Sequence, residues 1–171
     1  MDPRENLPNV KNFYNKTTRW LPWVYYDKNS LAIHYGFWND PQTPRKEALI
    51  NQYRLIRDLL NPKPGNLILD AGCGVGGASL WLAENTSAHY VGITISEAQL
   101  KMAKSYARKR GVEDRVAFYL KDYFDTKFEN EKFDSIFAIE SFCYAYPNPE
   151  ALYAEMFRIL KPGGRMVVSD G

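Results

Sequence analysis

The sequence has little cysteine, little histidine and almost no net charge. Its 171 residues include two cysteines and two histidines, and 22 basic side chains nearly balance 20 acidic ones to leave a formal charge of +2. Cys73 and Cys143 lack the spacing of zinc ligands, so we expect no metal site and two reduced, buried thiols. The small net charge gives no support for a surface that tracks the phosphates of nucleic acid, so no nucleic-acid partner is expected.

Long apolar runs are also missing. The sequence has no stretch of about 18 consecutive apolar residues, so no membrane-spanning helix and no stable membrane insertion are expected. The first ten residues, MDPRENLPNV, do not have the pattern of a signal peptide, and we expect a cytoplasmic protein. Apolar residues nevertheless make up 45% of the chain and aromatic residues 15%, which is enough for the core of one domain.

From residue 67 onward, short apolar segments alternate with helical patterns. The helices are expected at 77–84, 96–110 and 149–160, with Ser96 and Gln99 forming a capping box and Gly111 ending the second helix. Lys161-Pro162-Gly163-Gly164 reads as a turn before the last strand. This order is typical of right-handed βαβ units, so we predict an α/β fold with a parallel sheet and helices on both faces. The predicted strands are 67–71, 90–94, 116–120, 135–139 and 165–169.

Two other pieces precede the first strand. An aromatic-rich segment covers residues 12–38, in which Trp20, Trp23 and Tyr25 are expected to pack a small N-terminal core, and a helix is expected at about 44–60. The short linker Asn61-Pro62-Lys63-Pro64-Gly65 keeps this lead close to the sheet. We therefore divide the chain into an N-terminal helical lead and lid at 1–61 and a core at 62–171.

The segment 67–77 carries the clearest functional signal. A buried strand ending in Asp70 runs directly into Gly72-Cys73-Gly74-Val75-Gly76-Gly77, where glycines permit positive φ and the close approach of a ligand. Gly72, Gly74 and Gly77 also match the dinucleotide pattern G-x-G-x-x-G, but that pattern asks for an acid at the end of the second strand. The second strand ends in Gly92-Ile93-Thr94-Ile95-Ser96, without an acid. The hypothesis that the chain is a nicotinamide dehydrogenase is therefore supported by the glycines alone.

Three segments together resemble class I S-adenosylmethionine-dependent methyltransferases. They are LDAGCGVGG at 69–77, GITISEAQ at 92–99 and LKPGGR at 160–165. The second segment and the aromatic lead are similar to the sterol, tocopherol and cyclopropane-fatty-acid-synthase branch, where a Thr and Gln arrangement commonly replaces the second-strand acid. The resemblance implies a Rossmann-like core that binds S-adenosylmethionine and transfers its methyl group, by in-line displacement, to a small lipophilic or aromatic acceptor.

The resemblance also assigns residues to the cofactor. Asp70 would hold the turn or the ammonium group of the methionine moiety, and Thr94 and Gln99 would face the ribose and adenine. Asp122 would meet the adenine amino group, although a helix cap or a solvated turn is the alternative reading of this carboxylate. The expected cofactor-binding residues are Asp70, Gly72, Gly74, Gly76, Thr94, Ile95, Gln99, Asp122, Tyr123 and Tyr26.

Candidate catalytic residues lie in two other places. The run Ser30-Leu31-Ala32-Ile33-His34-Tyr35-Gly36-Phe37-Trp38 is similar to a lid that folds across the cofactor in this branch, with Tyr26, Tyr35 and Trp38 as aromatic candidates and His34 as a candidate base. Glu140 follows the fourth strand and would face the acceptor. Structural alternatives remain open for His34, as a buried partner of the aromatics, and for Glu140, as a capping carboxylate. Glu140, His34 and Tyr35 are the predicted catalytic residues.

The sequence stops soon after the fifth predicted strand. Methyltransferases of this class generally continue with a sixth and a seventh strand, which we expect to be absent here. An uncovered fifth strand, or the lid, would then pair with a second copy of the chain as a homodimer. The alternative to an active methyltransferase is a cofactor-binding module, or a truncated enzyme without full catalysis.

Overall fold

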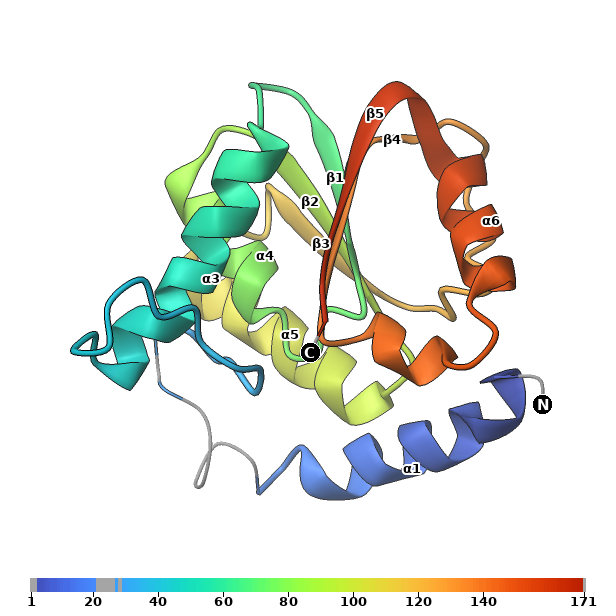
Figure 1. The fold of residues 1–171 in the computed structure, drawn as a ribbon, viewed down its shortest axis with the longest axis horizontal. Helices are drawn as coiled ribbons and strands as arrows, with labels where there is room; N and C mark the ends of the chain where they lie inside the picture. Colours follow the sequence, from blue (N-terminus) through green and yellow to red (C-terminus); the bar gives the residue numbers. More distant parts are fainter. Residues whose placement is uncertain (1–2, 21–26, 28, 171) are drawn as a thin grey trace.

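The computed structural model describes residues 3–20, 27 and 29–170. In this part of the chain five parallel strands form one sheet in the order β3-β2-β1-β4-β5 (Figure 1). The predicted parallel sheet is therefore confirmed. The strands are β1 (Leu67–Ala71), β2 (His89–Thr94), β3 (Val116–Leu120), β4 (Phe133–Ile139) and β5 (Leu160–Ser169).

Helices cover both faces of the sheet. Figure 1 shows α3, α4 and α5 on one side and α6 on the other. Alternate strand residues supply the two cores, because side chains along a strand point to opposite faces. Ile68 belongs to one buried cluster, whereas its neighbour Leu69 belongs to the other. The helices are α3 (Arg45–Leu60), α4 (Gly77–Asn85), α5 (Glu97–Arg110) and α6 (Glu150–Ile159).

The N-terminal part forms a 3-10 turn, η1 (Pro3–Asn6), and a helix, α1 (Leu7–Thr17), which the sequence analysis does not resolve as a separate element. In Figure 1, α1 runs along the lower edge of the molecule. An ion pair of 2.7 Å between Lys11 and Glu97 joins α1 to the start of α5. The tyrosine hydroxyls of Tyr14 and Tyr144 lie 2.7 Å apart and join α1 to η2 (Phe142–Ala145). Helix α1 is thus attached at two points, one on each side of the strand ends.

Three local expectations are wrong. Lys161-Pro162-Gly163-Gly164 belongs to the first half of β5, where the pairing with β4 shifts between Phe133 and Ser135, and Gly163 at φ +76° accommodates the irregularity. Cys143 is exposed rather than buried, because it lies on the cavity side of η2; both thiols are free, as expected. Trp20 is 60% exposed and does not pack in a core. Trp23 and Tyr25 lie outside the described residues.

Within the described ranges, no helix is long and apolar enough to cross a membrane. The same residues hold no group of three or more His, Cys, Asp or Glu side chains placed to bind a metal ion.

Candidate functional site

A cavity of about 290 Å³ lies where β1, β2 and β4 end. This is the expected place, because parallel strands present their carboxyl ends at one edge of the sheet. Helix α1, the segment around His34, the glycine turn and η2 complete its walls. The predicted site residues that line it are Asp70, Gly72, Gly74, Thr94, Ile95, Gln99, Tyr123, His34 and Glu140.

Asp70 is a buried carboxyl group on the cavity wall, with a side chain only 3% exposed. The hydroxyl of Ser79 on α4 donates a hydrogen bond of 2.7 Å to Oδ2. Burial raises the pKa of Asp70 from its ordinary value of 3.8 to about 7, and the bond from Ser79 offsets only part of that effect. A cationic group bound beside Asp70 would favour its charged form. Asp70 is therefore suited to hold a cation, and its charge responds to pH near neutrality.

The glycine turn brings the backbone to the cavity. Gly72 has φ +94°, and a Cβ on it would lie 2.4 Å from Cβ of Ser141, which is too close. Gly74 has φ +55°, and the atom nearest to a Cβ there would be Nε2 of Gln99 at 3.9 Å, so this side of the turn is open. Gly76, at φ +86°, is the N-cap of α4 and packs on Phe118 without lining the cavity. Close approach of a ligand to the main chain is thus possible at Gly72 and Gly74.

A pair of neutral side chains stands at the end of β2, where dinucleotide sites have an acid. Thr94 and Gln99 are both buried, and the Thr94 hydroxyl donates to Oε1 of Gln99 at 2.7 Å. This bond leaves Nε2 of Gln99 as a donor on the cavity wall. Ser96 caps α5 by accepting from the Gln99 backbone at 3.2 Å, as predicted. The Gln99 side chain bonds to Thr94 instead of completing the predicted capping box.

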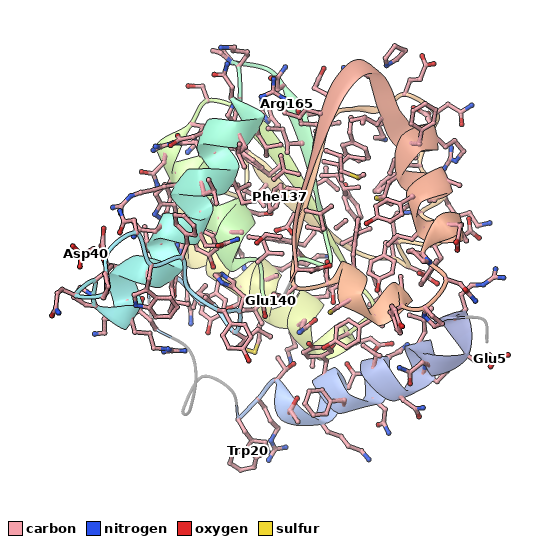
Figure 2. The ribbon with its side chains drawn as sticks, viewed as in Figure 1. Glu5, Trp20, Asp40, Phe137, Glu140 and Arg165 are labelled. Atoms are coloured by element: carbon pink, nitrogen blue, oxygen red, sulfur yellow. The ribbon has the colours of Figure 1, made fainter. Side chains whose placement is uncertain are left out.

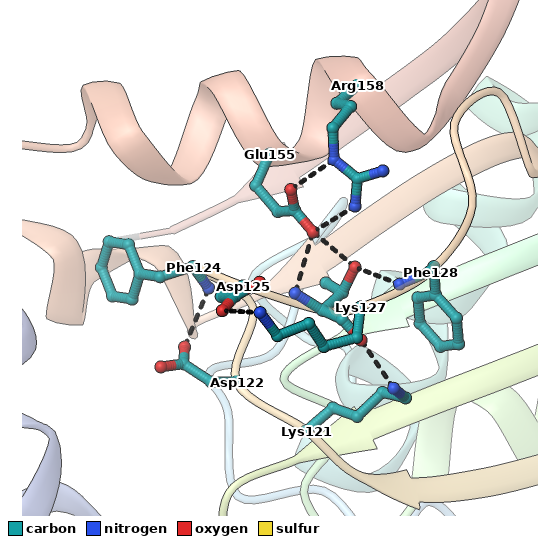
Figure 3. A network of polar contacts seen from close by, with 9 residues as sticks. Lys121, Asp122, Phe124, Asp125, Lys127, Phe128, Glu155 and Arg158 are labelled. Atoms are coloured by element: carbon teal, nitrogen blue, oxygen red, sulfur yellow. Dashed lines mark hydrogen bonds and ion pairs between the residues drawn. The ribbon is translucent and has the colours of Figure 1, made fainter.

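Asp122 and Tyr123 follow β3 and differ in position. Asp122 accepts a bond of 2.8 Å from the backbone of Phe124 and lies in a polar turn network (Figure 3). It lines an adjoining shallow depression, together with Arg4 and Lys11 from the N-terminal helices. Tyr123 lines the main cavity, and its hydroxyl donates to the Ser141 carbonyl at 3.0 Å. The structure thus separates Asp122, which has the local role of a turn cap, from the cavity itself.

His34, Tyr35 and Glu140 are brought together, but through the backbone of Tyr35. The Tyr35 N–H donates to Oε1 of Glu140 at 2.7 Å, and Nδ1 of His34 lies 2.7 Å from the Tyr35 carbonyl oxygen. The Tyr35 side chain itself is 78% exposed and does not line the cavity. Burial lowers the pKa of His34, whereas burial and the nearby Asp170 raise the pKa of Glu140. Figure 2 labels Glu140 near the strand ends, above α1.

The remaining lid candidates are Tyr26 and Trp38, and Trp38 does not line the cavity. Tyr26 lies outside the described residues. Trp38 is 46% exposed, and its indole N–H donates to the Thr43 carbonyl at 3.1 Å. The side chain therefore stabilises the loop between Trp38 and Thr43. From the lead, the tyrosines Tyr14 of α1 and Tyr53 of α3 line the cavity.

Sequence reasoning misses two polar residues that organise the site. The Ser141 hydroxyl donates to the carbonyl of Ala71 at 2.6 Å, and the Ser141 carbonyl accepts from the Tyr123 hydroxyl. Ser141 therefore joins the end of β4 to the end of β1. Asn15 of α1 accepts from the Ser96 hydroxyl at 2.6 Å and so holds α1 on α5. A backbone partner or a partner about 80 residues away leaves no local pattern in the sequence, and no signal could have identified either residue.

Comparison with known proteins identifies the family of the chain. A model of the family described as "Methyltransferase domain" matches residues 62–171. The chain belongs to this methyltransferase family. Methyltransferase GfsG from Streptomyces halstedii is 36% identical over 163 residues, which cover 94% of this chain and 57% of GfsG. The 24-methylenesterol C-methyltransferase 2 of Oryza sativa subsp. japonica is 34% identical over 158 residues, covering 92% of this chain and 42% of the relative.

Solved structures give the same fold for this methyltransferase domain. The [4+2]-cyclase SpnF has a TM-score of 0.85 and 31% identity, covering 92% of this chain and 58% of SpnF. Geranyl diphosphate methyltransferase, in complex with GPP and sinefungin, has a TM-score of 0.80 and 26% identity, covering 94% of this chain and 64% of the other. The predicted Rossmann-like fold is confirmed. The chain spans about half the length of the curated relatives it matches.

Proposed function

We propose that this chain binds S-adenosylmethionine and transfers its methyl group to a small lipophilic or aromatic acceptor. The observation that carries the proposal is the grouping, around one cavity, of buried Asp70, the turn at Gly72 and Gly74, and the Thr94–Gln99 pair. The relatives in the same family include named sterol methyltransferases and a geranyl diphosphate methyltransferase, which supports a lipophilic acceptor.

The cavity residues fit this cofactor in three respects. Asp70 has one side-chain donor, the Ser79 hydroxyl, and so retains acceptor capacity for the ammonium of the methionine moiety. The open side of Gly74 admits a ligand against the backbone, and no phosphate has to be neutralised. Gln99 offers Nε2 as a neutral donor for hydroxyl or ring acceptors of the adenosine.

When bound, the cofactor supplies a methyl group that is already activated by a sulfonium. The protein therefore has mainly to align the acceptor and exclude water, effects that are worth up to about 7–11 kcal/mol in well-oriented systems. Helix α1 contributes Val10 and Tyr14 to the roof of the cavity, and its two attachments hold that roof in place. The aromatic rings of Tyr14, Tyr123 and Tyr144 give the cavity faces that favour a cation and repel water.

Calorimetric titration of the purified chain with S-adenosylmethionine, S-adenosylhomocysteine and NADH tests the proposal. We expect heat of binding with the first two ligands and none with NADH. Transfer of a labelled methyl group is then measured on a sterol, a quinol, a tocopherol-like phenol and an amine. Absence of binding to S-adenosylmethionine would overturn the proposal.

A second candidate function is binding of the cofactor without methyl transfer. It is favoured by the similarity to SpnF, which is named as a [4+2]-cyclase although its fold is that of the methyltransferase family. Binding of S-adenosylmethionine without transfer to any offered acceptor supports this alternative, whereas labelled product excludes it.

Thr94 provides a specific prediction for the adenosine end. Thr94→Val removes the donor to Gln99 and the acceptor of the Ser96 N–H, which lies 3.2 Å from the hydroxyl. We expect S-adenosylhomocysteine to bind about 10-fold more weakly, the effect of one hydrogen bond of about 1.4 kcal/mol. Thr94→Ser keeps the hydroxyl and should retain most of the affinity in the same calorimetric titration. Equal loss in both variants would contradict the assignment.

A homodimer and a cytoplasmic location stay predictions. Strand β5 is an edge strand of the sheet in the described part of the chain, and pairing of this edge with a second copy is the proposed dimer contact. Sedimentation velocity over a range of protein concentrations tests the dimer.

A further inference from the structure

The backbone of Tyr35 is held from two sides by the two ionisable groups predicted to be catalytic. Its N–H donates to Oε1 of Glu140, and its carbonyl oxygen accepts from Nδ1 of His34, both at 2.7 Å. The Tyr35 side chain takes no part in this arrangement, because both contacts are made by backbone atoms, and the residue is 78% exposed. What the two side chains fix is therefore the path of the main chain.

That main chain is a wall of the cavity. Leu31, Ala32, Ile33 and His34 line the cavity from this segment, whereas Tyr35 and Phe37 are exposed and do not line it. The other end of the segment is anchored on α3, where the Phe37 N–H donates to the Ala48 carbonyl at 2.8 Å. A shift of Tyr35 would therefore move the wall between this anchor and Leu31.

Glu140 is oriented for this contact by the end of β4. It has φ +47°, a left-handed conformation that is uncommon outside glycine and costs energy. Its N–H donates to the Ser169 carbonyl at 2.8 Å, which fixes the turn against β5. The strained backbone directs a half-buried carboxylate to an N–H group that lies 105 residues away in the sequence.

His34 has the tautomer of a general base, but the nitrogen that would accept the proton is buried in this conformation. A carbonyl oxygen only accepts, so the hydrogen is on Nδ1 and the lone pair is on Nε2. Nε2 is buried and has no hydrogen-bond partner among the described residues. The ring packs edge-on against Tyr53, 5.2 Å between centroids. Burial, with a smaller contribution from Arg45 on α3, lowers the pKa of His34, and the neutral ring remains a donor to Tyr35.

We propose that Glu140 and His34 are positioning residues that clamp the Tyr35 backbone and hold segment 31–34 as a wall of the cavity. Glu140 acts here through an oxygen that accepts the Tyr35 N–H and not as a proton acceptor from the substrate. The proposal rests on the proposed function only for the ligand that occupies the cavity, since the clamp itself is a property of the free protein.

Two substitutions of Glu140 distinguish a clamp from a base. Glu140→Gln keeps an oxygen that can accept the Tyr35 N–H, whereas Glu140→Ala removes it. Amide hydrogen exchange, followed by NMR, reads the clamp directly at Tyr35. We expect similar protection in the wild type and in Glu140→Gln, and exchange at least about 10-fold faster in Glu140→Ala, the effect of losing about 1.4 kcal/mol of protection. Equal exchange in the two variants, or an unprotected Tyr35 amide in the wild type, would overturn the proposal.

The same variants are titrated with S-adenosylhomocysteine. The clamp predicts unchanged affinity in Glu140→Gln and weaker binding in Glu140→Ala, whereas a direct role of the negative charge predicts equal loss in both. If no form of the protein binds this ligand, the proposed function fails, and the exchange pattern still decides the clamp. Thermal unfolding of each variant separates a local effect from a loss of folding.

The tautomer of His34 gives an independent measurement. The chain has only two histidines, so ¹⁵N spectra of the imidazoles contain two sets of signals, which His89→Gln assigns. We expect the Nδ1–H form of His34 in the wild type and in Glu140→Gln, and a mixture of tautomers in Glu140→Ala, where the Tyr35 carbonyl is no longer fixed. An Nε2–H form in the wild type would contradict the clamp.

Discussion

Asp70→Asn is expected to weaken binding of S-adenosylhomocysteine about 30-fold at pH 8, the effect of losing about 2 kcal/mol from a charged hydrogen bond. The substitution keeps the size of the side chain and removes the negative charge that we propose meets the ammonium of the ligand. Asp70 is fully buried at the cavity wall, where such a charge is poorly screened by water. Calorimetry at pH 8 measures the change.

The pH dependence of the same titration gives the sharper readout. Burial holds the pKa of free Asp70 at about 7, so the carboxyl is largely protonated at pH 6 and largely charged at pH 8. A bound ammonium favours the charged form, so binding below pH 7 releases a proton and affinity rises with pH. We expect the wild type to bind about 10-fold more tightly at pH 8 than at pH 6, and the Asn variant to show little change. Affinity independent of pH in the wild type would contradict this role of Asp70.

Stability provides the control for Asp70→Asn. The pKa of Asp70 is raised in the folded state, so between pH 3.8 and about 7 the folded protein binds more protons than the unfolded one and loses stability as pH rises. An uncharged asparagine escapes this loss. Weaker binding together with an unfolding midpoint equal to or above that of the wild type at pH 8 would separate the role of Asp70 in binding from a role in folding.

The sheet and the glycine turn could be predicted from the sequence because both are local features. A run of consecutive apolar residues predicts a buried strand. The glycines at 72 and 74 predict a turn, because glycine adopts positive φ values easily. Thr94 and Gln99 are only five residues apart, and the Thr94 hydroxyl donates to the Gln99 side chain. These parts of the site needed no knowledge of distant contacts.

The packing of α1 and the cavity wall around His34 and Glu140 could not be predicted in the same way. The Tyr14–Tyr144 contact spans 130 residues, and the partners of His34 and Glu140 are backbone atoms of Tyr35. Backbone groups are the same in every residue, so such a contact leaves no trace in residue type. For this reason the sequence points to the aromatic side chain of Tyr35, whereas its backbone makes the contacts. Cys143 is exposed because its residue lines the cavity, and this too depends on contacts between distant segments.

Gly72→Ala is expected to destabilise the fold strongly. Gly72 combines a left-handed backbone at φ +94° with a Cβ position 2.4 Å from Cβ of Ser141. The backbone conformation costs an alanine about 1 kcal/mol and overpacking a further 1–3 kcal/mol, so we expect the free energy of unfolding to fall by about 2–4 kcal/mol. Urea unfolding measures the loss, and S-adenosylhomocysteine binding should fall with it, because the turn moves.

Gly65→Ala is the matched control for Gly72→Ala. Gly65 has a similar φ of +80°, but a Cβ there would have nothing within 4 Å. It should therefore lose only the backbone contribution of about 1 kcal/mol and leave ligand binding unchanged. The difference in stability between the two alanine variants measures the cost of the contact with Ser141. In the Gly72→Ala background, Ser141→Gly should recover part of the lost stability, because it removes the Cβ that the alanine would meet. If the two variants lose equal stability, the turn needs glycine only for its φ, and the close approach to Ser141 does not contribute to the loss.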